Sequence, residues 1–276
     1  MKSVHINDIE IGAGAPLAFM AGPCVIESRD HAMRMAEQLK ELFASLDAPL
    51  IFKSSYDKAN RSSIDSFRGP GVEEGAKILG EIREQFDLPI LTDVHEPYQV
   101  EIIAEVADIM QVPAFLSRQT DLILAIAESG KVVNVKKGQF LAPWDIEQVI
   151  KKIESTGNEQ ILITERGASF GYNNLISDMR AFPMMKKFGY PVILDATHSA
   201  QLPGGLGDAT GGQREFIPYI ARAAIAAGAN AVFMEVHDDV ENAKSDATTQ
   251  WPLQKTETLV KQLQEIYEVT KNMGDL

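Results

Sequence analysis

Cysteine is almost absent from this sequence, because Cys24 is the only one among its 276 residues. A chain with one cysteine cannot form a disulfide within itself, which favours a reducing compartment and predicts a cytoplasmic protein. Long apolar runs are also lacking, since none approaches the roughly 18 residues that a membrane-spanning helix needs. Residues 1–12 alternate polar and apolar side chains, so they do not resemble a secretory signal peptide. We therefore expect no membrane partner.

Positive charge is the second scarcity. The chain has 26 lysine and arginine residues against 39 aspartate and glutamate residues, for a formal net charge of −13. A protein this acidic is a poor partner for nucleic acid or for an anionic membrane surface. A local cluster of cations could still bind a small anionic substrate.

Apolar runs rich in Val, Ile and Leu recur along the chain, separated by amphipathic stretches of helical period such as residues 30–46 and 71–86. Near-continuous apolar runs alternating with helices are typical of a parallel sheet buried on both faces. The last helical pattern covers residues 253–273. The predicted strands are residues 17–22, 49–54, 89–94, 108–112, 131–136, 160–165, 191–196 and 231–236.

Eight such units match a (β/α)8 TIM barrel in number and in length. A doubly wound sheet is the competing fold, but neither glycine-rich stretch, 12–17 or 204–212, has the dinucleotide-binding spacing. The sequence has no linker or change in composition, so we predict a single domain over residues 1–276. Residues 1–14 should form a hairpin at the amino-terminal end of the barrel, which itself spans residues 17–276.

Polar or ionisable residues follow all eight predicted strands, where a barrel carries its chemistry. Several are cations, with more in the adjoining loops, which predicts a basic pocket for phosphates or carboxylates within an acidic protein. The residues at the strand ends are Cys24, Lys53, Asp93 with His95, Gln111, Lys136, Arg166, Asp195 with His198, and Glu235 with His237; the loop cations are Lys58, Arg61, Arg68 and Arg118.

Barrel closure places the eighth strand beside the first, which brings Cys24, His198 and Glu235 together, with Asp246 in reach. A thiolate, an imidazole and two carboxylates suit a divalent ion such as Fe²⁺, Zn²⁺, Mn²⁺ or Co²⁺. The alternative for Cys24 is a small buried side chain that packs as an apolar residue. The alternatives for His198 are a general base and a loop residue that only makes local hydrogen bonds. The spacing has no regular motif, so this hypothesis depends on the topology.

The rim residues lie in strings that resemble the 3-deoxy-D-manno-octulosonate 8-phosphate synthase family over essentially the whole chain. No single string is specific to this family, but the strings together are strong evidence for the resemblance. They are "AGPCVIES" (21–28), "FKSSYDKANRSS" (52–63), "GPG" (69–71), "TDVHE" (92–96), "QVPAFLSRQTDL" (111–122), "NVKKGQF" (134–140), "TERGASFGYNNL" (164–175), "DATHSAQLPG" (195–204) and "SDATTQWPL" (245–253).

The resemblance implies condensation of phosphoenolpyruvate with D-arabinose 5-phosphate, releasing phosphate by cleavage of the C–O bond, for lipopolysaccharide biosynthesis. It further implies a homotetramer whose Arg118 loop reaches a neighbouring site. Family members with a cysteine after the first strand require a metal, which implies that Cys24, His198, Glu235 and Asp246 bind one. The implied participants in the reaction are Cys24, Lys58, Asp93 and His198. The implied substrate contacts are Lys53, Lys58, Asn60, Arg61, Ser62, Asp93, Gln111, Arg118, Lys136, Arg166 and Gln201.

Rival functions remain open from the sequence. A 3-deoxy-D-arabino-heptulosonate 7-phosphate synthase would use erythrose 4-phosphate and the same metal residues, but "KANRSS" (58–63) favours the pentose enzyme. A non-catalytic barrel would show degraded rim residues, and none is missing here. A metal-dependent hydrolase would usually show several metal-binding histidines, whereas this chain has five histidines in all, and His5 lies outside the predicted barrel. The five glycines of residues 202–212 predict a mobile lid after the seventh strand.

Overall fold

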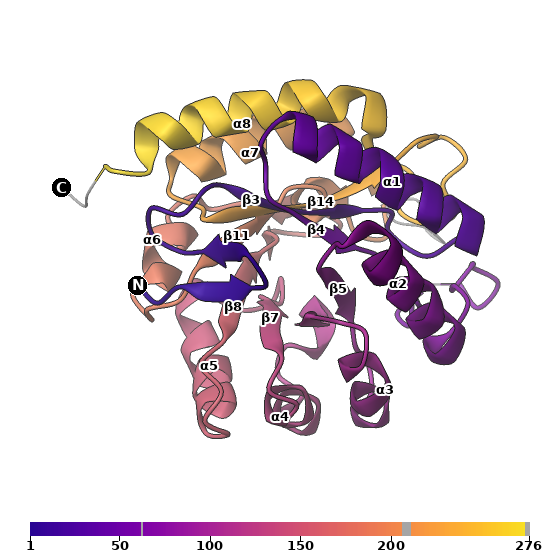
Figure 1. Ribbon diagram of the computed structural model, residues 1–276. Helices are drawn as coiled ribbons and strands as arrows, with labels where there is room; N and C mark the ends of the chain where they lie inside the picture. Colours follow the sequence, from indigo (N-terminus) through magenta and orange to yellow (C-terminus); the bar gives the residue numbers. More distant parts are fainter. Residues whose placement is uncertain (62, 206–210, 274–276) are drawn as a thin grey trace.

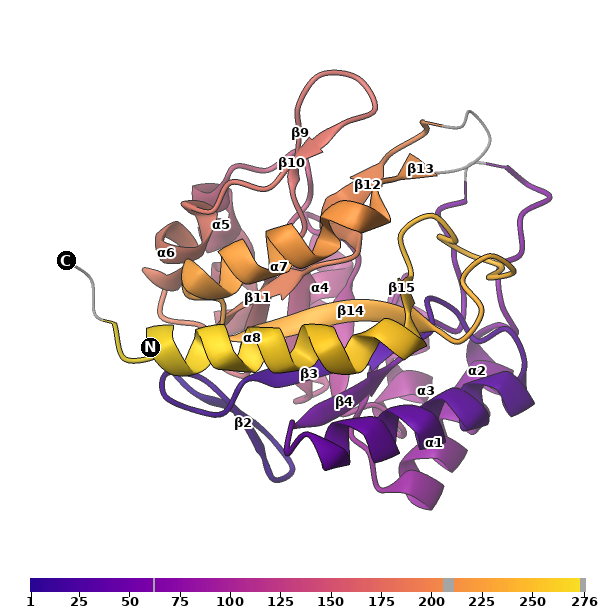
Figure 2. The same ribbon diagram turned by 90° about the horizontal axis from the view of Figure 1, so that it is seen from above.

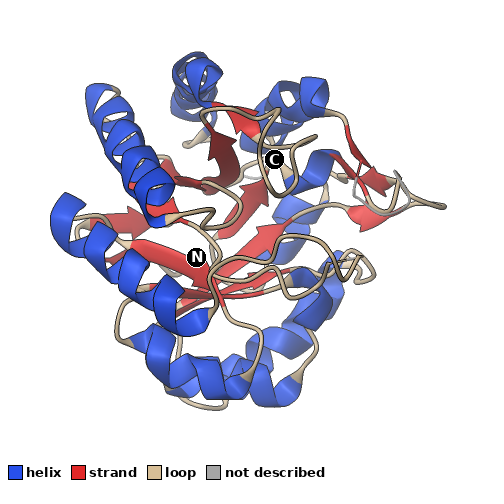
Figure 3. Ribbon diagram, turned by 90° about the vertical axis from the view of Figure 1, so that its right-hand side faces the viewer, coloured by secondary structure: helices blue, strands red, loops and turns tan. Residues whose placement is uncertain are grey.

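The computed structural model describes residues 1–61, 63–205 and 211–273. Eight parallel strands form a closed barrel, because β11 pairs with both β8 and β14, and β14 pairs with β3. Figure 3 shows the helices surrounding these strands. The (β/α)8 prediction is therefore confirmed. The barrel strands are β3 (Ala18–Gly22), β4 (Leu50–Lys53), β5 (Ile90–Asp93), β6 (Ile109–Val112), β7 (Val132–Lys136), β8 (Ile161–Glu165), β11 (Val192–Asp195) and β14 (Ala231–His237).

The helices follow the strands as the hydrophobic periodicity predicts, and their apolar faces pack on the outside of the barrel. The final helix begins at residue 256 and not at 253, because a turn of 3₁₀-helix precedes it. The α-helices of the described residues are α1 (Arg29–Ser45), α2 (Val72–Phe86), α3 (Val100–Ala104), α4 (Thr120–Glu128), α5 (Ile146–Glu154), α6 (Ala181–Lys186), α7 (Ile217–Ala226) and α8 (Thr256–Thr270); the 3₁₀-helices are Pro97–Gln99, Ala114–Leu116, Pro143–Asp145, His198–Ala200, Arg214–Phe216 and Leu253–Lys255.

Proline sets the start of three strands. The sequence predicts strands that include Pro49, Pro89 and Pro191, but β4, β5 and β11 each begin at the following residue. Proline has no N–H to donate to a sheet. Its carbonyl still accepts, as in the bond from the Phe52 amide to Pro89 at 2.8 Å. The shift is therefore one residue in each case.

The amino-terminal hairpin closes one end of the barrel. Antiparallel β1 (Val4–Ile6) and β2 (Ile9–Ile11) lie across that end in Figure 1. Their buried side chains share one cluster with inward-facing residues of all eight barrel strands, which confirms the predicted position of the hairpin. The cluster contains Val4, Ile6, Ile11, Ala18, Met20, Ile51, Leu91, Ile109, Val132, Leu162, Ile193, Ala231 and Phe233.

Among the described residues, three short strand pairings lie beyond the eight predicted units and the hairpin, and the sequence patterns did not reveal them. The antiparallel pairs β9 (Ala168–Ser169) with β10 (Leu175–Ile176), and β12 (Gln201–Leu202) with β13 (Gly211–Gly212), extend on the side away from the hairpin (Figure 2). The third strand, β15 (Trp251–Pro252), pairs with the end of β14.

The described part of the chain contains no helix with both the length and the apolar character needed to cross a bilayer. Part of the predicted lid, residues 206–210, and the predicted phosphate ligand Ser62 lie outside the described residues.

Candidate active site at the carboxyl ends of the barrel strands

The carboxyl ends of the barrel strands surround a cavity of about 740 Å³. Most of the side chains that the sequence predicts for a site line this cavity, although they come from all parts of the chain. They are Lys53, Lys58, Asn60, Arg61, Asp93, Gln111, Lys136, Arg166, His198, Gln201, Glu235 and Asp246. Cys24 is fully buried just beneath them.

Close packing of β3 against β4 delivers Cys24 to this position. A Cβ atom on Gly22 would lie 2.1 Å from the carbonyl oxygen of Lys53, so only glycine permits the approach. After the strands end, the two segments continue side by side. The Ser54 hydroxyl donates to the carbonyl of Pro23 at 3.0 Å, and the Ser55 amide donates to the carbonyl of Cys24 at 3.3 Å. The turn that ends β3 therefore fixes the thiol beneath the cavity.

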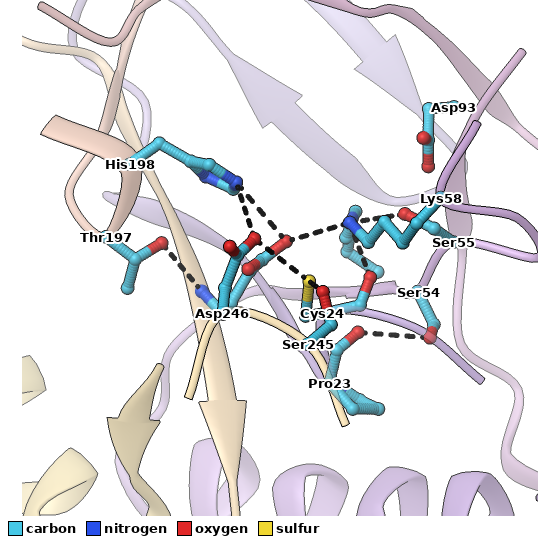
Figure 4. Close-up of polar contacts among 12 residues, drawn as sticks. Pro23, Cys24, Ser54, Ser55, Lys58, Asp93, Thr197, His198, Ser245 and Asp246 are labelled. Atoms are coloured by element: carbon cyan, nitrogen blue, oxygen red, sulfur yellow. Dashed lines mark hydrogen bonds and ion pairs between the residues drawn. The ribbon is translucent and has the colours of Figure 1, made fainter. Parts of the chain in front are cut away.

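Cys24, Glu235, Asp246 and His198 converge at one side of the cavity, where Figure 4 shows the thiol, His198 and Asp246 pointing toward one another. The thiol donates to the Ser245 hydroxyl at 2.9 Å and lies 3.4 Å from Asp246 Oδ2. One ligand atom from each of Cys24, Glu235 and Asp246 lies within 4.8 Å of the others. His198 Nε2 lies 3.7 Å from a carboxylate oxygen of both Glu235 and Asp246.

This arrangement fits a divalent cation. Glu235 Oε2 is buried without a hydrogen-bond partner, and the donor atoms are those that borderline divalent ions prefer. Burial, and next the charge of Glu235, raises the pKa of the Cys24 thiol well above its usual value. A bound cation would instead favour the thiolate, since a coordinating thiol is deprotonated. The four predicted ligands are thus brought together by the fold.

Asp195 orients His198 from the opposite side of the ring. Its Oδ2 lies 2.8 Å from His198 Nδ1 and 2.6 Å from Lys136 Nζ. Burial alone would raise the pKa of Asp195, but the charges of His198 and Lys136 outweigh it and hold the pKa far below the usual range. An ionised Asp195 favours a hydrogen on Nδ1, so that in the neutral ring Nε2 is the nitrogen with the lone pair, and it faces the two carboxylates.

Lys53 and Lys58 lie close to Glu235, which is fully buried. The Glu235 Oε1 atom lies 3.2 Å from Lys53 Nζ and 3.5 Å from Lys58 Nζ. Burial by itself would lower the pKa of Lys58, but the neighbouring Cys24 and Glu235 raise it well above the usual value. For Glu235 these lysines and His198 outweigh burial and lower the pKa. The cations and the predicted metal ligands form one connected electrostatic network.

Arg166 extends the positive side of the cavity. Its Nη2 donates to Gln201 Oε1 at 2.6 Å, while Nε and Nη1 are buried without partners. Burial lowers the pKa of Arg166, as it does that of Lys136. Unpaired buried donors are costly in a folded protein unless a ligand satisfies them. Arg166 is therefore prepared to hold an anion.

Asp93 and Gln111 form the remaining wall. His95 Nε2 lies 3.0 Å from Asp93 Oδ2, and the other carboxylate oxygen of Asp93 is buried without a partner. The Gln111 Oε1 atom accepts from the side-chain amide nitrogen of Asn134 at 3.3 Å. That acceptance turns the Gln111 amide nitrogen away from Asn134. Both residues thus keep polar atoms available to a ligand.

Two predicted substrate contacts have other surroundings. Arg118 is exposed and is not among the residues that line the cavity of its own chain. Arg61 lines the cavity, but its guanidinium donates to the backbone carbonyls of Phe67 at 3.0 Å and Lys244 at 3.4 Å. A phosphate bound by Arg61 would have to compete with these bonds.

Comparisons with known proteins identify the family of this chain. The sequence model of the DAHP synthetase I family matches residues 2–272. The chain belongs to that family. Among curated relatives, a protein from Geotalea uraniireducens is 55% identical over 98% of this chain and 100% of its own length. One from Protochlamydia amoebophila is 54% identical over 99% of this chain and 100% of its own length.

A third family relative, from Acidithiobacillus ferrooxidans, is 57% identical over 98% of this chain and 96% of its own length. All three relatives are named 2-dehydro-3-deoxyphosphooctonate aldolase. That name denotes the octulosonate synthases that the sequence strings resemble, so the resemblance is confirmed.

The sequence did not reveal the residues that hold the side chains of this site in place. Asp195 was visible at the end of a strand, three residues before His198, but its bonds to His198 and Lys136 were not predicted. Ser245 and Gln250 were also missed. The Cys24 amide donates to Gln250 Oε1 at 3.2 Å. No sequence signal identifies such a contact, because the partners are 226 residues apart.

Proposed function

We propose that this protein is a metal-dependent 3-deoxy-D-manno-octulosonate 8-phosphate synthase. It condenses phosphoenolpyruvate with D-arabinose 5-phosphate and releases phosphate, making the eight-carbon sugar acid of lipopolysaccharide. The observation that carries the proposal is the match over nearly the full chain to relatives with one shared name. The cavity supports it, because a pocket rich in cations within a chain of net charge −13 suits two phosphorylated substrates.

The anionic groups of phosphoenolpyruvate are assigned to Lys53, Lys136 and Arg166. These three cations reach the cavity from the ends of β4, β7 and just beyond β8. The unpaired donors of Arg166 supply a fork that matches a phosphate or carboxylate. Lys136 lies 3.8 Å above the Phe233 ring, which fixes its ammonium group beside Asp195.

The pentose phosphate is assigned to the wall formed by the β4–α2 loop and β5. Lys58 and Asp93 are assigned to the sugar hydroxyls and to the reaction, and Gln111 and Gln201 to substrate contacts, because all four line the cavity. Arg61 and Ser62 are assigned to the distal phosphate, and Asn60 to the sugar. A site built from specific hydroxyl contacts discriminates sharply against a substrate that lacks one of them.

Cys24, His198, Glu235 and Asp246 are assigned to the divalent ion, either Fe²⁺, Zn²⁺, Mn²⁺ or Co²⁺. When bound, the ion supplies a fixed positive charge that orders the thiolate and the carboxylates at the reacting centre. His198 presents Nε2 to the centre because Asp195 holds the other side of the ring. The ion serves chiefly to organise these residues.

The family also supports a homotetramer in which Arg118 completes the site of a neighbouring subunit. The exposed position of Arg118, outside the cavity of its own chain, agrees with this role. A cytoplasmic location agrees with the lone cysteine, because the chain cannot form the internal disulfides that are common in oxidising compartments.

The experiment that tests the function is a panel of aldose phosphates offered with phosphoenolpyruvate, with phosphate release as the measurement. We expect kcat/KM for arabinose 5-phosphate to exceed that for erythrose 4-phosphate by at least about 100-fold. Ribose 5-phosphate, which differs in configuration at carbon 2, serves as the matched control for chain length. Equal efficiency with the four-carbon and five-carbon substrates would contradict the assignment.

A further inference from the structure

The loop after β14, residues 238–250, carries Asp246 and must be held against Cys24. A half-buried carboxylate from the segment between β3 and α1 secures this loop: Glu27 Oε1 accepts from the Lys244 backbone amide at 2.8 Å. Glu27 itself is well placed, because the next residue, Ser28, caps α1 by accepting from the His31 amide. The helix start thus supports the carboxylate that binds the loop two residues before Asp246.

His237 fixes the same carboxylate from the end of β14. The Asp239 amide donates to His237 Nδ1 at 3.0 Å, so in the neutral ring the hydrogen resides on Nε2. That nitrogen lies 3.2 Å from Glu27 Oε1 and donates to it. Glu27, His31 and His237 are close enough to bind a cation. Since both nitrogens of His237 already have hydrogen-bond partners, a hydrogen-bonded clamp explains this cluster better.

Gln250 links the loop of residues 238–250 to the segment after β3 at a second point. Its side chain is fully buried, accepts from the Cys24 amide at 3.2 Å and donates to the Ser245 carbonyl at 2.8 Å. The backbone at Lys244 and at Ser245 is therefore held by a side chain in each case. Asp246 comes next, in the left-handed conformation with φ 47°, and its carboxylate reaches to within 3.4 Å of the Cys24 sulfur (Figure 4).

We propose that Glu27 and Gln250 are positioning residues that hold Asp246 at Cys24 and thereby set the affinity of the site for its divalent ion. The inference rests on the proposed metal-dependent function. Neither residue lies among those assigned to substrate or metal. Partners that orient metal ligands typically change metal affinity or activity by about 10–100-fold when they are removed.

Glu27 offers a matched pair of variants. Glu27→Ala removes the acceptor for the Lys244 amide and for His237. Glu27→Gln keeps an acceptor oxygen of the same reach and removes only the charge. Arg34→Ala is the control, because Arg34 contacts the base of the same loop at Asp238 Oδ2, 3.2 Å away, and touches neither Glu27 nor Lys244.

The measurement is a Co²⁺ titration of the metal-free enzyme against a competing chelator, read by the thiolate-to-cobalt absorption band. We expect Glu27→Ala to weaken Co²⁺ binding by about 10–100-fold and Glu27→Gln by less than about 5-fold. Arg34→Ala should match wild type. Hydrogen exchange of the amides of residues 244–246, measured without metal, should be faster in Glu27→Ala alone among the three variants.

Two failures are distinguishable. If Glu27→Ala folds and shows wild-type exchange at residues 244–246 together with wild-type Co²⁺ affinity, the clamp is wrong and the metal centre stands. If wild type gives no thiolate-to-cobalt band, the metal centre is wrong, and the exchange of the same amides still decides whether Glu27 holds the loop.

Discussion

The two ends of this barrel are built from the same eight strands but have opposite chemistry. At the amino-terminal end, inward-facing residues such as Met20 and Leu91 pack with Ile11 of the hairpin in a wholly apolar cluster. At the carboxyl end, Lys53, Lys136 and other ionisable side chains are buried around the cavity. A few residues along each strand separate the two environments.

The difference separates stability from function. Burying charges costs desolvation free energy that pairing repays only in part, so the carboxyl end is poorly suited to stabilise the fold. The apolar end and the strand–helix interface supply the hydrophobic stabilisation that the charged end lacks. This division follows the general rule for such barrels, in which the upper face carries chemistry and the lower face carries stability.

Cys24→Ser should have the largest effect and should separate the two ends most clearly. A serine hydroxyl rarely ionises, so kcat/KM should fall by more than about 100-fold, beyond the usual loss for removing an outer-shell partner. The melting temperature of the metal-free protein should stay close to that of wild type. Steady-state kinetics and thermal unfolding of the same preparations measure both quantities.

Cys24→Asn is the matched comparison for that variant. Its amide can hydrogen-bond to His198 and retain water where the thiolate lay, so we expect less bound metal but measurable turnover that resists chelators. Such turnover would support an organising role for the ion. A folded Cys24→Asn protein that binds both substrates and shows no turnover would assign the ion a chemical role.

Ile11→Val tests the opposite end and should have the smallest effect. Removing one methylene from this fully buried side chain should cost about 1 kcal/mol of the free energy of unfolding. Because Ile11 lies at the far end of the barrel from the cavity, kcat/KM should stay within about 2-fold of wild type. Chemical denaturation and kinetics check this. A large loss of activity without a loss of stability would erase the distinction between the ends.

The local patterns were enough to predict the eight strands, the hairpin and the residues at the strand ends, because a parallel barrel repeats one pattern and fixes its order. Barrel closure then put Cys24, His198 and Glu235 together without any motif. The contact of Gln250 with Cys24 was beyond prediction, since the two residues are 226 positions apart and meet only through the path of a loop. Asp195 is three residues from His198, but its bonds to His198 and Lys136 depend on side-chain orientations that the sequence pattern does not specify. The short pairs β9–β10 and β12–β13 contain two residues per strand, too few to show a period.

The most direct test of a metal-assisted condensation at the carboxyl end is removal of the metal from the wild-type enzyme. Metal content is measured after dialysis against a strong chelator, and phosphate release from phosphoenolpyruvate and arabinose 5-phosphate is followed before and after Fe²⁺, Mn²⁺, Co²⁺ or Zn²⁺ is added. We expect most activity to disappear with the metal and to return to a different degree with each ion. Full activity in enzyme verified to be metal-free would contradict the assignment of Cys24, His198, Glu235 and Asp246 as ligands.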